Sequence, residues 1–583
     1  MSDPQDPQSP PEQHLSRRAA REAAEAAEAG KASAPAAPLG DDQPTTELIP
    51  VDGATELLPV AATTARVPAD AETALLPSGA ETVLIPATGP VGSSTGAQGP
   101  DATGEPRASL KATATAALGG LFATIKRHPN AWLFSALGLV FVLLGTGAVF
   151  AGVAVGSPSP AAVVVPTSTP TPTPRPTPSA IADPTHLRTC SVAKQASDPN
   201  LLTFQGSVIN ATTGEVLFDR AGATPARTAS VMKTLTSSAG LAVLGPGYQF
   251  STKVYEGSTP GSIVLVGGGD PTLSALGPGE ESVYKGAPKL SDLATQVKAA
   301  WAAAHPDPIT SVVLDANMWN PADNWDPTWE RSEQTQGYQP EITALMVDGD
   351  RANPQAQDSP RSNDPVGHAG SAFVSAMGLP ASVPVTAGSA TVGTKLLGEV
   401  KSQPLKTLIS YMLPVSDNTL AEMIARVTSK VSGSDGSSAS LNTVIPAALA
   451  TYGLQTSGLT IIDGSGESNS NGVPATFVAQ LMTKVAAGVQ NLKIVYDALP
   501  IAGKTGTLAG RFTGANAIAR GAVNAKTGWI KTEYALAGVV HAADGTTLAF
   551  AFYALGAING KTQPALDTIT TAVFSCGNNL SNN

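Results

Sequence analysis

Residues 131–155 form one stretch without a charged side chain, and this stretch divides the chain into parts that must fold separately. As a helix it would be roughly 37 Å long, enough to cross a hydrocarbon core of about 30 Å with some tilt. Lys126 and Arg127 precede it, and the next basic residue is Arg175. Because basic residues stay on the cytoplasmic side, we expect a single-pass protein of the cell membrane with a cytoplasmic N-terminus and an extracytoplasmic C-terminal part. A cleaved signal peptide, the alternative, would lie nearer the start and have a shorter apolar run.

Residues 1–125 are expected to be a disordered, acidic, cytoplasmic tail. They hold 16 Asp and Glu against 7 Lys and Arg, a net charge of −9, whereas the 30 acids and 28 bases of residues 126–583 give only −2. The tail has almost no aromatic residue, so it cannot bury enough apolar surface to fold alone.

A nine-residue repeat runs through residues 46–86 of this tail, and each unit ends in Pro, which excludes a continuous helix. Low-complexity drift is one interpretation. The other is an array of docking motifs, which a cytoplasmic Ser/Thr kinase could phosphorylate for a phosphothreonine-binding protein. The repeats begin at Thr46, Thr55, Thr64, Thr73 and Thr82.

The chain after the apolar stretch changes from a stalk to a globular pattern. Residues 157–184 contain nine Pro among 28 residues, which is typical of an extended polyproline-like spacer. From about residue 186, apolar periodicity indicates an α+β layered fold. We expect a hairpin at 204–219, helices from about 230 and at 417–430 and 475–487, strands at 520–526, 534–542 and 546–554, and a last helix at 561–574.

The only two cysteines, Cys190 and Cys576, bracket the globular region. Outside the cell such a pair can oxidise, so we predict one disulfide that joins the first and last segments, with two free buried thiols as the alternative. No basic patch suggests a nucleic-acid partner, and no histidine pair has metal-ligand spacing. We therefore expect no metal, cofactor or nucleic acid.

Three short motifs follow one another in the globular region: an SxxK from Ser230 to Lys233, an SDN from Ser416 to Asn418, and a KTG from Lys526. In this order they are typical of active-site-serine enzymes that open amides or β-lactams. Ser230 would begin a helix, where backbone N–H groups favour developing negative charge. Lys233, one turn later on the same face, could take the serine proton.

The middle motif would serve proton relay and substrate binding. Ser416 would pass a proton between Lys233 and the leaving nitrogen, and the amide of Asn418 would fix the substrate backbone. The nearby carboxylates of Asp417 and Glu422 are better explained as turn or helix-surface groups than as catalytic ones.

A second copy of each motif occurs in the sequence, and we assign no catalytic role to these copies. The SxxK at 191–194 precedes the first strand, and the SLN at 440–442 lies in a Ser/Gly-rich loop, so we reject both. The KTG at 504–506 is flanked by glycine and favours a turn. The copy at 526–528 ends a strand-like run, and a strand edge is what an extended peptide substrate needs.

Together with LVGGGDPTL at 265–273, DGSG at 463–466 and a Gly-rich segment at 503–512, the motifs resemble those of the class C low-molecular-mass penicillin-binding proteins, the D-alanyl-D-alanine carboxypeptidase/endopeptidase family. The resemblance spans residues 186–577. It implies a transpeptidase/β-lactamase-like domain, an antiparallel sheet flanked by helices, with an inserted subdomain. The domain would comprise residues 186–239 and 400–577, and the insertion 240–399.

The resemblance also implies the role of each motif residue. Ser230 would be the acyl-enzyme nucleophile, Lys233 the base and Ser416 the relay. Backbone N–H groups of Ser230 and Trp529 would form the oxyanion hole. The family usually has Thr where this chain has Trp529. The substrate-binding residues would be Asn418, Lys526, Thr527, Gly528 and Trp529.

We therefore predict a membrane-anchored, extracytoplasmic serine DD-peptidase that cleaves the D-Ala-D-Ala of peptidoglycan stem peptides through an acyl-enzyme and is acylated by β-lactams. Carboxypeptidase and endopeptidase action both stay open. The alternative is a wall-binding receptor, weak or inactive because of Trp529 and linked to cytoplasmic phospho-signalling. A β-lactamase is a third option, but we find no glutamate obviously placed to activate the deacylating water.

Overall fold

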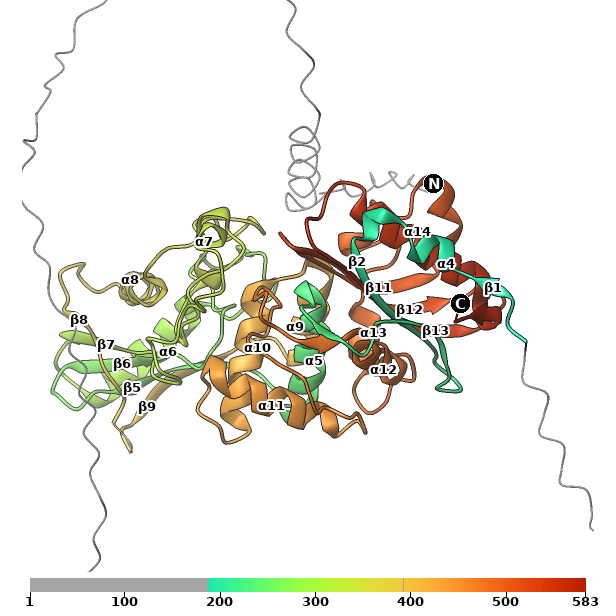
Figure 1. The fold of residues 1–583 in the computed structure, drawn as a ribbon. Helices are drawn as coiled ribbons and strands as arrows, with labels where there is room; N and C mark the ends of the chain where they lie inside the picture. The colour runs from blue at the N-terminus through green and yellow to red at the C-terminus, as the bar shows by residue number, and fades with distance from the viewer. Residues whose placement is uncertain (1–186, 392, 583) are drawn as a thin grey trace, which may run out of the picture. The chain divides into compact units, whose positions relative to one another are not determined.

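The computed structural model describes residues 187–391 and 393–582 (Figure 1). The expected tail at 1–125 with its repeats, the membrane span at 131–155 and the stalk at 157–184 all lie outside the described residues. Within the described ranges, no helix is both long and apolar enough to cross a membrane.

The main sheet has five antiparallel strands in the order β11-β12-β13-β2-β3. The N-terminal hairpin β2–β3 pairs with β13, so segments from both ends of the described chain share one sheet (Figure 1). The expected hairpin at 204–219 is confirmed. The strands are β2 (Thr203–Asn210), β3 (Val216–Arg220), β11 (Val523–Ile530), β12 (Glu533–His541) and β13 (Thr547–Leu555).

The predicted strand at 520–526 was misplaced. β11 begins at Val523 and continues through the KTG motif to Ile530, because β12 supplies a pairing partner for each residue up to the turn at 531–532. Lys526 lies opposite Ala537 and Trp529 opposite Tyr534. The motif therefore lies inside the strand and not at its end.

Side chains of the central strands alternate between two cores, as the pleat of a strand requires. Ala535 and Ala537 face the core shared with α5 (Met232–Val243) and α12 (Ala475–Ala486), whereas Leu536 faces the core shared with α14 (Thr562–Cys576). Helices therefore cover both faces of the sheet (Figure 1).

Four more helices complete the part of the fold around α5, and α5 packs against each of them. The expected helix at 417–430 is confirmed as α10. The helix expected from Ser230 begins with a 3₁₀ turn at Ala229–Val231, and its α-helical part starts at Met232. The four helices are α9 (Leu405–Val415), α10 (Asn418–Val431), α11 (Ser438–Ala450) and α13 (Lys493–Ala498).

The chain between α5 and α9 forms a second five-stranded sheet, of order β8-β7-β6-β5-β9, with its own hydrophobic core. Strands β6, β7 and β8 are parallel, and β5 is antiparallel to β6 and β9. The elements are β5 (Ser251–Glu256), β6 (Ser262–Val266), α6 (Leu290–Ala304), β7 (Ser311–Asp315), α7 (Ser332–Gln336), α8 (Pro365–Met377), β8 (Val385–Ala387) and β9 (Leu396–Lys401).

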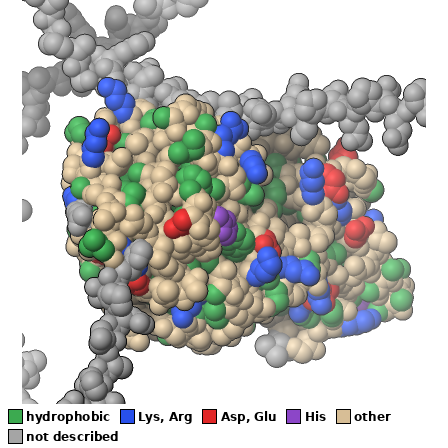
Figure 2. Space-filling model, turned by 90° about the vertical axis from the view of Figure 1, so that its right-hand side faces the viewer, with side chains coloured by type: hydrophobic (Ala, Val, Ile, Leu, Met, Phe, Trp, Pro, Cys, Tyr) green, Lys and Arg blue, Asp and Glu red, His purple; other side chains and the backbone are tan. Residues whose placement is uncertain are grey.

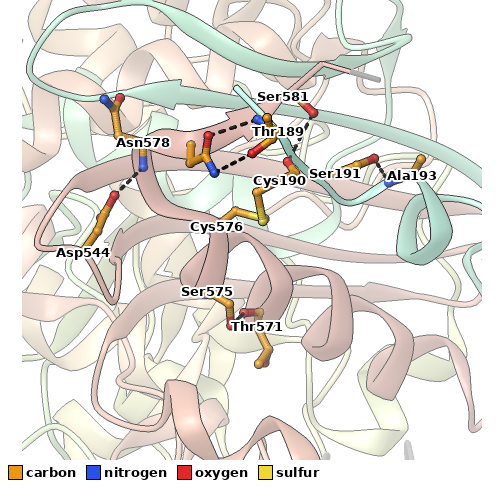
Figure 3. The surroundings of a disulfide bond; sticks show 11 residues. Thr189, Cys190, Ser191, Ala193, Asp544, Thr571, Ser575, Cys576, Asn578 and Ser581 are labelled. Atoms are coloured by element: carbon orange, nitrogen blue, oxygen red, sulfur yellow. Dashed lines mark hydrogen bonds between the residues drawn. A yellow bond between two sulfur atoms is a disulfide. The ribbon is translucent and has the colours of Figure 1, made fainter. Parts of the chain in front are cut away.

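A disulfide joins Cys190 to Cys576, with 5.4 Å between their Cα atoms (Figure 3). Cys190 lies in β1 (Cys190–Ser191), which pairs with β14 (Leu580–Ser581), and Cys576 ends α14. Beside the bond, Thr189 N donates to Asn579 Oδ1 at 3.0 Å (Figure 3). The bond thus ties the first described segment to the last.

The inserted segment meets the SDN motif at a buried ion pair. Arg351 Nη2 donates to Asp417 Oδ2 at 2.8 Å, and the two side chains are 0% and 1% exposed. Tyr284 OH and Gln357 Nε2 donate to the same oxygen, each at 3.2 Å, while Asp417 Oδ1 caps α10 by accepting from Leu420 N. Burial alone would raise the pKa of Asp417, but Arg351 and the other donors outweigh it and the pKa lies below its usual value. Our interpretation of Asp417 as a turn or surface carboxylate was incomplete, since it is a cap that lies wholly inside the protein.

We expect the double variant Cys190→Ser/Cys576→Ser to lose about 2–5 kcal/mol of unfolding free energy, because the disulfide restricts an unfolded chain over a long loop. Denaturant unfolding of wild type and variant with and without reductant measures this. The reductant should lower the stability of the wild type only. A wild type unaffected by full reduction would contradict the prediction.

We expect Arg351→Ala to lower the unfolding free energy by about 3–5 kcal/mol, because it leaves the carboxylate of Asp417 buried without its cation. The double variant Arg351→Met/Asp417→Asn removes both charges and should lose less. Urea unfolding of the three proteins gives the comparison. A single variant that is as stable as the double variant would show that the unpaired carboxylate costs nothing.

Candidate active site

The SxxK motif places its two functional side chains in contact. Ser230 lies in the 3₁₀ turn that precedes α5, and Lys233 lies in the first turn of α5. Lys233 Nζ is 2.9 Å from Ser230 Oγ, and the residues are 0% and 3% exposed. The lysine is therefore within reach of the serine proton without any further movement.

Two fixed carbonyl oxygens hold Lys233 in place. Its Nζ donates to Asn418 Oδ1 and to the backbone oxygen of Ser465, both at 2.7 Å. Two of the tetrahedral positions around the nitrogen are thus directed at acceptors, and a third is directed at Ser230 Oγ. In the uncharged amine this third position can carry the lone pair that receives the serine proton.

The SDN motif connects the first motif to the third. Ser416 ends α9 in the left-handed conformation, with φ of 62°, a strained geometry for a residue other than glycine. Its Oγ accepts a hydrogen bond from Lys526 Nζ at 2.9 Å. Asn418, two residues later, contacts Lys233 instead. The flanking Asp417 holds both neighbours in place through the ion pair described above.

The KTG strand approaches the nucleophile closely. A Cβ on Gly528 would lie 2.9 Å from Thr228 O and 3.0 Å from Ala229 Cβ, so a larger residue there would push β11 away from the turn that carries Ser230. Lys526 occupies the same face of β11 as Gly528 and is 0% exposed.

The alternate residues of β11 have a different environment. Trp529 is half-buried and packs against the hydrophobic core on the α14 side, which also contains Val523 and Ala525. Thr527 Oγ1 donates to Thr507 Oγ1 at 2.8 Å. Ala525 N donates to Pro500 O, and Val523 O accepts from Ala502 N, so both groups point away from β12. Because the direction of the backbone N–H alternates along a strand, the N–H of Trp529 also points away from β12. That orientation suits an oxyanion-hole donor.

A loop from Asp463 to Asn471 packs directly against the nucleophile turn. A Cβ on Gly466, whose φ is +84°, would lie 1.9 Å from Ala229 O, so only glycine fits. Ala229 itself has a positive φ of 40°, so the backbone is strained immediately before Ser230.

Two buried carboxylates shape this loop. Asp463 accepts from Gly466 N at 2.8 Å and from Trp329 Nε1 at 2.8 Å, and Glu422 accepts from Ser465 N at 2.7 Å. Burial, together with the charge of Asp463, raises the pKa of Glu422 to about 7. The expectation that Glu422 lies on the helix surface was wrong, because it is 1% exposed. Glu422 positions the carbonyl that binds Lys233.

The structure brings Ser230, Lys233, Ser416, Asn418 and the KTG strand together, whereas the ring of Trp529 packs on the α14 side of β11. Several neighbours of the site were missed. Ser465 and Glu467 lie in the loop that contains the DGSG sequence, and Thr507 lies in the 3₁₀ turn Gly506–Leu508. The sequences of these segments indicated the family but not the roles of the three residues. Glu467 Oε2 accepts from Asn418 Nδ2 at 3.0 Å. Arg351 had no signal in the sequence, because its partner lies 66 residues away.

A small cavity lies beside the SDN motif, lined in part by Ser416, Asn418, Arg351 and Arg361. In the described part of the chain, no three His, Cys, Asp or Glu side chains cluster to hold a metal ion. The face in Figure 2 carries positive and negative side chains interspersed, with hydrophobic side chains in small separate groups.

Comparison with known proteins identifies relatives over most of the described region. A model of the D-Ala-D-Ala carboxypeptidase 3 (S13) family matches residues 189–366 and 357–574. The carboxypeptidase DacB of Mycolicibacterium smegmatis is 34% identical over 393 residues, 66% of this chain and 84% of that protein. A D-alanyl-D-alanine carboxypeptidase of an Actinomadura species is 28% identical over 451 residues, 63% of this chain and 79% of that protein.

Solved structures agree on the architecture. Penicillin binding protein 4 (dacB) of Haemophilus influenzae is similar with a TM-score of 0.53 and 19% identity, and the match covers 64% of this chain and 95% of that one. The described region therefore has the expected transpeptidase/β-lactamase-like fold. The chain belongs to the D-Ala-D-Ala carboxypeptidase 3 (S13) family, that of the class C low-molecular-mass penicillin-binding proteins.

Proposed function

We propose that this chain is a serine-type D-Ala-D-Ala carboxypeptidase that acts on peptidoglycan stem peptides, with Ser230 as its nucleophile. The observation that supports this most directly is the 2.9 Å contact between Lys233 Nζ and Ser230 Oγ. This pair lies in one buried cluster with the SDN and KTG motifs. In this family such a cluster carries acyl transfer through a serine ester.

The acylation step follows from these positions. Ser230 Oγ attacks the carbonyl carbon between the two D-Ala residues, and its proton passes to Lys233 Nζ. The C–N bond then breaks, and the proton reaches the leaving amine by way of Ser416. Free D-Ala departs, and the rest of the peptide stays as an ester on Ser230. A β-lactam presents an amide carbonyl to the same serine and would be held in the same way.

The third motif would bind the substrate. Lys526 supplies a positive charge for the terminal carboxylate, close to Thr527. The backbone N–H groups of Ser230 and Trp529 would stabilise the oxyanion that forms during attack. The outer edge of β11 would pair with the extended peptide.

The expected membrane anchor belongs to the same proposal. Residues 131–155 would cross the membrane once, with residues 1–125 in the cytoplasm and the catalytic domain outside. The Pro-rich segment at 157–184 would extend at about 3.1 Å per residue and let the domain reach the wall. An oxidised Cys190–Cys576 bond is consistent with an extracytoplasmic location.

We expect Ser230→Ala to abolish labelling by a fluorescent penicillin and to reduce D-Ala release at least about 10³-fold, because no nucleophile remains. The matched control is Ser191→Ala, in the second SxxK sequence, which should label like the wild type. Labelling that persists in Ser230→Ala would refute the nucleophile. A wild type that binds muropeptides but releases no D-Ala would support the wall-binding receptor instead.

We expect the full chain to fractionate with membranes, and external protease to remove the catalytic domain while residues 1–125 stay protected. Deletion of 131–155 should release the protein into the soluble fraction. A full-length chain that is soluble with this stretch intact would contradict the anchor, without bearing on the enzyme activity.

A further inference from the structure

Glu467 lies next to the catalytic cluster but belongs to none of the three motifs. Its carboxylate Oε2 accepts a hydrogen bond from Asn418 Nδ2 at 3.0 Å, and the other end of the same amide, Oδ1, accepts from Lys233 Nζ at 2.7 Å. Glu467 is half-buried, so water can reach it. One amide side chain therefore separates this carboxylate from the lysine that contacts the nucleophile.

The position of Glu467 is fixed by its neighbours on both sides. Ser465, two residues earlier, gives its carbonyl oxygen to Lys233 Nζ at 2.7 Å. Gly466 lies so close to Ala229 that no side chain fits between them. On the other side, Ser468 N donates to the buried Asp463 carboxylate at 2.6 Å. A rigid loop thus presents Glu467 beside the residues that flank Ser230.

Acylation and deacylation place different demands on this site. Acylation uses the serine proton, for which Lys233 is in contact. Deacylation needs a water molecule to lose a proton as it attacks the ester, and a carboxylate that water can reach is a group that commonly accepts this proton. In the sequence no glutamate was obviously placed for such a role, but the folded loop brings Glu467 to Asn418.

We propose that Glu467 is the general base for deacylation, an inference that rests on the serine mechanism proposed above. A water molecule between Glu467 and the ester attacks the carbonyl carbon, and its proton moves to the carboxylate as the new C–O bond forms. Lys233, left uncharged after acylation, first takes up a proton from solvent. The bond from the carbonyl carbon to Ser230 Oγ then breaks, and Oγ receives that proton from Lys233, so the amine is uncharged again. Glu467 releases the proton of the attacking water to solvent. The net reaction is hydrolysis of the ester by one water molecule.

This role predicts an acyl-enzyme that turns over, whether the acyl group comes from a peptide or from a β-lactam. A simpler role for Glu467 would be to orient Asn418 for substrate binding. The two roles can be separated, because a glutamine at position 467 keeps an oxygen that accepts from Asn418 Nδ2 but cannot take the water proton.

The experiment measures both steps in the full chain. Purified wild type, Glu467→Gln and Glu467→Ala are mixed with a fluorescent penicillin to obtain the acylation rate, and the label is then chased with unlabelled penicillin to obtain the deacylation rate. We expect Glu467→Gln to acylate within about threefold of the wild type and to deacylate about 10²-fold more slowly. Glu399→Gln, a half-exposed carboxylate on β9 that pairs with Lys253 and Lys401, should match the wild type in both steps.

Three other outcomes would contradict the proposal, each for a different reason. If Glu467→Gln behaves like the wild type while Glu467→Ala acylates slowly, Glu467 only orients Asn418 and the proposal fails. If both variants deacylate at the wild-type rate, Glu467 has no part in the step and the proposal also fails. If the wild type itself is not acylated at Ser230, the serine mechanism fails first.

Discussion

Two lysine side chains, Lys233 and Lys526, lie fully buried in the middle of this protein, and the rest of the site is arranged around them. A buried amine that carries a charge is tolerated only where hydrogen-bond acceptors surround it. Lys233 obtains them from Asn418 and from the carbonyl of Ser465. Lys526 obtains them from Ser416 and from the carbonyl of Thr527. Four segments far apart in the sequence must therefore converge: the nucleophile turn, the SDN motif, the DGSG loop and the KTG strand.

Buried carboxylates that do not contact Ser230 hold these acceptors in place. Glu422 binds the backbone N–H of Ser465, whose carbonyl contacts Lys233, so the carboxylate acts on the lysine through the loop. Asp417 caps α10 between the two functional residues of the SDN motif. Its partner Arg351 comes from the inserted segment. The insertion is therefore part of the catalytic architecture as well as an added subdomain.

The sequence was sufficient to predict the elements and residues whose signals are local. Helix periodicity, the hairpin and the spacing of the three motifs are read within short windows, and they gave the correct architecture and a set of residues that the fold brings together. The extent of β11 was missed because it depends on the partner strand β12. Arg351 and Glu467 were missed for the same reason, since each has its role only through Asp417 or Asn418, and such pairs depend on tertiary contacts.

The effect of a Trp at position 529 depends on which face of β11 its ring occupies. From the sequence, a bulky ring in place of a small hydroxyl residue suggested a damaged substrate site. In the sheet, the ring belongs to the face of β11 that packs toward α14, whereas Lys526 and Gly528 belong to the face that meets the nucleophile turn. The mechanism uses only the backbone N–H of residue 529, and every residue except proline has one. The hydroxyl of Thr527 remains at the strand edge, paired with Thr507. The ring therefore leaves the groups that transfer protons unchanged, which favours an active enzyme over a receptor without turnover.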